Sequence, residues 1–154
     1  MLTLDETKGV FVEKLEELLD AEAPQEADSA GAYVESPESF QGHGKERIAG
    51  VPGAGIVELA GPILLKGIVA VAAAVWAQIK DQAIEDASTA VRDWLARVFR
   101  KGEARLSVTT KEETVAAIAT SLIRAGWDAD KAGRAAKRVW QQGQEAGRRL
   151  AATT

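Results

Sequence analysis

The segment Gly50–Gly55, of sequence GVPGAG, has the glycine spacing of a loop that cradles phosphate. Glycine suits such a loop because its backbone adopts unusual dihedral angles and lets the chain approach a ligand closely. In a complete site, a lysine after the second glycine reaches the β- and γ-phosphates, and the next hydroxyl residue binds magnesium. Here these two positions are occupied by Ile56 and Val57, which supply neither a charge nor an oxygen ligand.

Over these residues the sequence resembles the phosphate loop of P-loop NTPases, and the resemblance implies nucleotide binding. The residues before it, Lys45–Ala49, are too few and too polar for the buried strand that such a loop follows. No later apolar strand ends in an aspartate that offers a second magnesium ligand. We therefore expect no nucleotide and no other cofactor, and we interpret the segment as an elbow between two parts of the chain.

Other residues that do chemistry are sparse. The chain has one histidine, His43, which lies between two glycines, and it has no cysteine. No metal-ligand spacing surrounds the histidine. The neighbouring carboxylates at 16–17 and 112–113 are explained by a solvated helix face and a helix N-terminus. We expect no metal site, no catalytic residues and no enzymatic activity.

The charge is divided unevenly along the chain. Residues 1–46 hold twelve acidic and three basic residues, a net charge of −9, whereas residues 47–154 hold eleven acidic and sixteen basic residues, a net charge of +5. Together they give the net charge of −4 of the whole chain. We expect the acidic part to contact the basic part, within one chain or between chains. The alternative is that the acidic residues only keep an exposed segment soluble.

The elements that must position these residues are helices. Thr3 and Glu6 have the spacing of a capping box, apolar residues follow at helical intervals, and Pro24 marks the end of this first helix. The residues from Ala23 to Lys45 show no period and contain prolines, serines and glycines, which is typical of a linker. Tyr33, within it, is expected to anchor the linker to the rest of the protein.

A second helix is predicted from Pro62 to Lys101. Trp76 and Trp94 are eighteen residues apart, a whole number of helical turns, so both are expected to be buried on one face of this helix. Unbroken, the helix would be about 60 Å long at 1.5 Å per residue. Two shorter helices follow, with caps at Thr109 or Thr110 and at Asp128 and a stop at Gly126, and they form a helical hairpin.

The predicted fold is all-α, with no strand: a long central helix, a C-terminal helical hairpin and an N-terminal amphipathic acidic helix joined by a linker. The predicted parts are an acidic helix over residues 1–22, an acidic linker with a glycine- and proline-rich elbow over residues 23–61, and a helical body over residues 62–154. Small residues on one face of the last helix permit close helix packing. The large apolar residues expected to make interaction contacts are Phe11, Leu15, Leu18, Trp76, Trp94, Phe99, Trp127 and Trp140.

Two functions fit this pattern. The first is a non-catalytic helical interaction or assembly protein that binds a protein partner or itself as a homo-oligomer. The second is a membrane-active or membrane-tethered protein, because residues 63–79 are apolar on all sides and Lys66 is their only charge. The alanine-rich composition of this run favours the first.

The other expected properties concern location and nucleic acid. The sequence MLTLDETKGV has no cationic region followed by an apolar one, so we expect a cytoplasmic protein without a secretory signal. The last helix has a basic face, but acidic residues accompany it and no reading motif is present. We expect no binding to nucleic acid.

Overall fold

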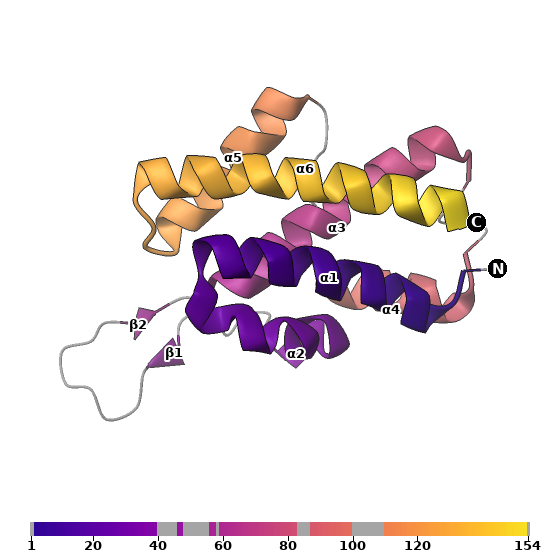
Figure 1. Cartoon of the computed structure of the whole chain (residues 1–154), viewed down its shortest axis with the longest axis horizontal. Helices are drawn as coiled ribbons and strands as arrows, with labels where there is room; N and C mark the ends of the chain where they lie inside the picture. Colours follow the sequence, from indigo (N-terminus) through magenta and orange to yellow (C-terminus); the bar gives the residue numbers. More distant parts are fainter. Residues whose placement is uncertain are drawn as a thin grey trace.

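The computed structural model describes residues 2–39, 46–47, 56–57, 59–82, 87–99 and 110–153. These residues confirm the all-α class (Figure 1). The α-helices are α1 (Leu4–Glu22), α2 (Ala30–Glu35), α3 (Ala60–Ile79), α4 (Thr89–Val98), α5 (Lys111–Arg124) and α6 (Ala129–Thr153). Two short 3₁₀ helices, η1 (Pro24–Ser29) and η2 (Pro37–Ser39), flank α2.

Local signals set several helix ends as predicted. The Thr3 side chain accepts a hydrogen bond from the backbone N–H of Glu6 at 3.1 Å and so caps α1. Thr110 caps α5 in the same way, through the N–H of Glu113 at 3.2 Å. Gly126, at φ 107°, ends α5 in the left-handed region that favours glycine. The predicted hairpin of α5 and α6 is thereby confirmed.

The first difference from the sequence prediction concerns residues 23–39. They were expected to form a linker without regular structure, but they fold into η1, α2 and η2 and pack against α1 and α3. Tyr33 and Val34 are 3% and 1% exposed, so the expected anchoring by Tyr33 is confirmed. These helices are too short to show a hydrophobic period in the sequence, and burial of a few apolar side chains holds them instead.

The second difference is the break in the long helix. The prediction of one helix from Pro62 to Lys101 is wrong, because α3 ends at Ile79 and α4 begins at Thr89. Lys80 is extended, at φ −122° and ψ 111°, and Ser88 caps α4 through the N–H of Val91 at 3.3 Å. The break lets α4 fold back beside α1 and α2. An unbroken helix would instead extend past the rest of the protein.

The third difference is a minimal antiparallel ladder that the sequence did not indicate. It joins β1 (Glu46–Arg47) to β2 (Ile56–Val57) in the register Glu46 to Val57 and Arg47 to Ile56. The glycine-spaced segment Gly50–Gly55 and His43 lie outside the described residues.

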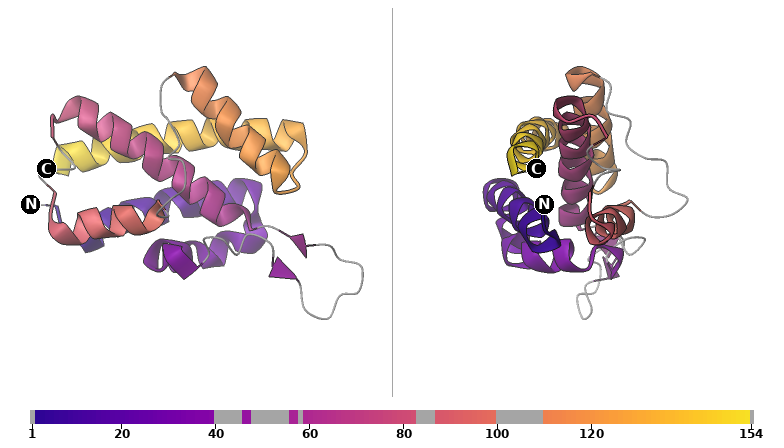
Figure 2. Two further views of the ribbon diagram at one scale, coloured as in Figure 1. Left: turned by 180° about the vertical axis from the view of Figure 1, so that it is seen from behind. Right: turned by 90° about the vertical axis from the view of Figure 1, so that its right-hand side faces the viewer.

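The helices form two groups around one core. In one group, α3 crosses α6 and α5 contacts both. In the other group, α1 runs alongside α6, and both α2 and α4 lie against α1 and α3 (Figures 1 and 2). The most extensive contact is between α3 and α6. The apolar run therefore lies at the centre of the bundle, and most of its side chains serve the core.

Glycines let α3 and α6 approach closely. A Cβ atom built on Gly143 would lie 2.5 Å from Cβ of Val71, and one on Gly147 would lie 2.7 Å from the carbonyl oxygen of Ala72. Real Cβ atoms do not come so near, so the crossing depends on the missing side chains. This confirms the prediction that small residues on the last helix permit close packing.

Gly147→Ala is expected to lower the free energy of unfolding by about 1–2 kcal/mol. The added methyl meets the α3 backbone, and such overpacking costs about 1–3 kcal/mol, which exceeds the gain of up to about 1 kcal/mol from replacing a helical glycine. Gly133→Ala in the same helix is the matched control, since no atom lies within 4 Å of its Cβ position. This control should stabilise the protein. Urea denaturation of both variants measures the two effects, and equal signs would contradict the close-packing argument.

Candidate functional site

The predicted interaction residues fall into two groups. Five are at most 1% exposed and belong to the hydrophobic core: Phe11, Leu15, Leu18, Trp76 and Trp94. Three are partly exposed: Phe99, Trp127 and Trp140. The first group already contacts its own chain, so only the second is accessible to a partner in this fold. The role of all eight in binding stays a prediction.

Trp94 shows how the core is closed. Its indole N–H donates to the carbonyl oxygen of Val34 at 2.7 Å, and its ring stacks on Phe11 with the centroids 5.3 Å apart. The predicted burial of Trp76 and Trp94 is confirmed. The prediction that one helix face carries both is wrong, because they lie on α3 and α4.

Charged side chains line both helices where α1 meets α6. We call this set the α1–α6 seam, and it contains Glu13, Lys14, Glu17 and Glu22 of α1 and Arg134, Arg138, Gln142, Glu145 and Arg149 of α6. Glu13 pairs with Arg149, an acid of the first part with a base of the second, whereas the pair of Lys14 with Glu145, at 2.8 Å, has the reverse polarity. The expected contact between the acidic N-terminal part and the basic remainder is therefore present within the chain.

Glu22 is the most buried group of the seam. Its side chain is 2% exposed and pairs with Arg134 at 3.0 Å and Arg138 at 3.1 Å. The guanidinium of Arg134 donates to both carboxylate oxygens. Glu22 raises the pKa of Arg134 by hydrogen bonding and by its charge. A buried carboxylate needs such partners, because a buried charge without one is strongly destabilising.

At the other end of the seam, Arg149 holds the pKa of Glu13 below its ordinary value through a hydrogen bond and its positive charge. A carboxyl whose pKa is lowered by folding contributes stability above its unfolded pKa, and this contribution is lost as the pH falls through its folded pKa. Both side chains are about half exposed. Solvent screening therefore keeps the contribution small.

The N-terminus of α3 is closed by a residue of the acidic part. The Glu26 carboxylate accepts hydrogen bonds from the N–H groups of Ala60 at 3.2 Å and Gly61 at 2.9 Å, and from the hydroxyl of Tyr33 at 2.9 Å. Leu59, at the cap position, makes no side-chain cap. Free N–H groups at a helix start attract anions. Here a carboxylate of the same chain already fills that position.

Glu26→Ala is expected to lower the free energy of unfolding by about 1–2 kcal/mol, the usual loss on removing a helix cap. Glu35→Ala is the matched control: this carboxylate is 69% exposed and pairs with Lys8. Its removal should cost less than about 0.5 kcal/mol. Urea denaturation compares the two variants. A Glu26 variant as stable as the Glu35 variant would show that the cap does not contribute to the free energy of unfolding.

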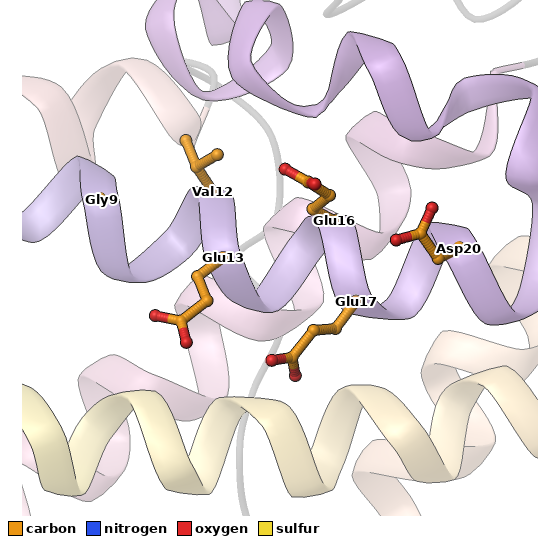
Figure 3. Close-up of a pocket in the computed structure, with 6 residues that line it drawn as sticks. All are labelled: Gly9, Val12, Glu13, Glu16, Glu17 and Asp20. Atoms are coloured by element: carbon orange, nitrogen blue, oxygen red, sulfur yellow. The ribbon is translucent and has the colours of Figure 1, made fainter.

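The outer side of α1 carries a shallow hollow of about 440 Å³, which we call the α1 groove (Figure 3). Its lining residues are Gly9, Val12, Glu13, Glu16, Glu17 and Asp20. In Figure 3 the carboxylates of Glu13 and Glu17 point toward α6, and those of Glu16 and Asp20 point to the opposite side of α1. Within the described residues, Glu16 and Asp20 form no ion pair, and no group of three or more His, Asp or Glu side chains could hold a metal ion.

Sequence reasoning found the two sides of the seam but not their pairing. The acids of α1 and the polar residues of α6 each recur at helical spacing. This common spacing is the signal from which the two helix faces could have been paired. The Glu26 cap had no such signal, because it lies 34 and 35 residues from the N–H groups that it binds. No family model, curated protein or solved structure matches the chain.

Proposed function

We propose that the protein is a non-catalytic helical interaction protein that assembles with itself in the cytoplasm. The observation that carries the proposal is that large apolar side chains stay at the surface although the core is closed. Ile79 and Ile123 are 54% and 47% exposed, and Trp127 and Trp140 are partly exposed. Tryptophan is enriched among residues that dominate binding energy at interfaces.

The interior supports the same proposal. All six described α-helices contribute large side chains to one core, and the described polar groups that approach it are mostly paired. The α1 groove is an open hollow on one helix, whereas small-molecule sites are usually enclosed. Both features favour contacts with a protein surface over binding of a substrate.

Sedimentation velocity over a hundredfold concentration range tests self-assembly. The expected result is a mass that rises above that of the monomer as the concentration increases. Ile79→Ser and Ile123→Ser remove exposed apolar surface and show which end of the protein takes part. A wild-type chain that stays monomeric throughout the range contradicts self-assembly.

The membrane alternative is supported by α3. This helix is long and apolar enough to cross a bilayer, although such a helix is also typical of the core of a soluble protein, and 61% of its most apolar 18-residue window lies inside the fold. Flotation with vesicles of anionic or zwitterionic lipid tests this alternative. Co-flotation of the wild-type chain supports it, and its absence with both lipids contradicts it.

A further inference from the structure

Trp140 stands apart from the other three tryptophans. Trp76 and Trp94 belong to the core and Trp127 packs against it, whereas Trp140 is partly exposed on α6 and lies outside that cluster. Among the described residues its ring has no aromatic or cationic neighbour within contact distance, and its indole N–H has no hydrogen-bond acceptor.

The residues one helical turn from Trp140 divide between core and surface: Ala136 and Gly143 are buried, whereas Lys137 and Gln144 are polar and at least partly exposed. Lys137 and Arg148 share its face at helical spacing, both are exposed, and neither forms an ion pair with another described residue. The α1–α6 seam lies on the opposite side of α6, as the spacing of Arg138 and Arg149 from Trp140 requires. Trp140 is therefore directed away from the α1 groove of its own chain.

The α1 groove has the complementary properties. No atom lies within 4 Å of the Cβ position of Gly9, so this position faces open space, and Val12 adds an apolar side chain to the lining. Glu16 and Asp20 stand beside it with their charges unpaired among the described residues. Its volume of about 440 Å³ falls within the range of about 300–1,000 Å³ found for sites that take drug-sized molecules, so an indole ring is not too large for it.

We propose that Trp140 of one copy inserts into the α1 groove of a second copy, with Lys137 directed at Glu16 and Asp20 of that copy. The inference rests on the proposed self-assembly and names its interface. Exposed ion pairs contribute little, so the indole carries the affinity and the charges orient the contact. The two surfaces differ, so the contact is head to tail and continues from copy to copy unless a ring closes.

Two single variants of the full chain test the contact. Trp140→Ala removes the inserted side chain, and Gly9→Leu fills the groove at an open helix position that tolerates a side chain. Each is expected to lower the self-association constant at least about tenfold in sedimentation velocity, while thermal melting shows the fold unchanged. Arg92→Ala, which alters an exposed residue of α4 outside the contact, should leave association unchanged.

A mixture of the two variants is the sharper test. Gly9→Leu still carries Trp140, and Trp140→Ala still carries the groove, so an equimolar mixture should form a 1:1 dimer that cannot grow. Wild-type association that both variants retain would overturn this interface and leave the proposed self-assembly standing. Monomeric wild-type protein would overturn both. Failure of the mixture to dimerise, with each variant folded and monomeric, would also overturn the pairing.

Discussion

Ala72→Glu is expected to lower the free energy of unfolding by about 3–5 kcal/mol, the cost of an unpaired charge in a protein interior. Ala72 is 0% exposed on α3, and its carbonyl oxygen lies against Gly147 of α6. A carboxylate placed there would be buried in the core, close to the point where the two helices touch. Urea denaturation, followed by circular dichroism, measures the loss.

Ala77→Glu is the matched control, because Ala77 lies on the same helix but is exposed. A negative charge near a helix C-terminus costs at most about 1 kcal/mol. The pair also separates the two proposed functions. If Ala72→Glu melts like the parent and only abolishes vesicle binding, α3 serves lipid and is loosely covered in the folded protein. The expected large loss of stability supports a core role.

Trp94→Ala is expected to cost about 3–5 kcal/mol, the usual loss for truncating a buried aromatic residue. The substitution removes the stacking on Phe11 and leaves the carbonyl oxygen of Val34 without its donor. Both partners belong to the N-terminal part of the chain, so α4 should separate from α1 and α2 first. Urea denaturation measures the loss, and hydrogen exchange of residues 89–98 reports the separation.

Two variants control this prediction. Trp94→Phe keeps an aromatic ring but loses the hydrogen bond, and an unsatisfied buried acceptor costs about 1–3 kcal/mol. Trp140→Ala makes the same truncation at a partly exposed site and should cost less than about 1 kcal/mol. Equal losses for Trp94→Ala and Trp140→Ala would contradict the assigned role of Trp94 in closing the core.

The sequence predicted well those elements whose signals are local. The start of α1 at Thr3 and the hairpin of α5 and α6 rest on side chains that bond to backbone groups three residues away. The apolar period of these helices is long enough to read directly. Their existence, type and ends follow from contacts within one or two helical turns.

The errors share one cause. The spacing of the two tryptophans predicts one continuous helix, but agreement with the helical period does not exclude the turn that lies between Ile79 and Thr89. The segment 23–39 shows no hydrophobic period because each of its helices is at most two turns long. In both places the local structure depends on contacts with residues distant in sequence, and a local sequence pattern contains no information about those contacts.

The candidate surfaces divide in the same way. The charge imbalance between the two parts of the chain is visible in the sequence and indicates a contact between them. The small residues of α6 are visible too and indicate a close helix crossing. The tertiary structure alone decided that Glu22 meets Arg134 and Arg138, that Glu26 caps α3, and that Trp140 stays outside the core. Helical spacing determines which side chains share a face, but only packing of the whole chain determines what each face meets.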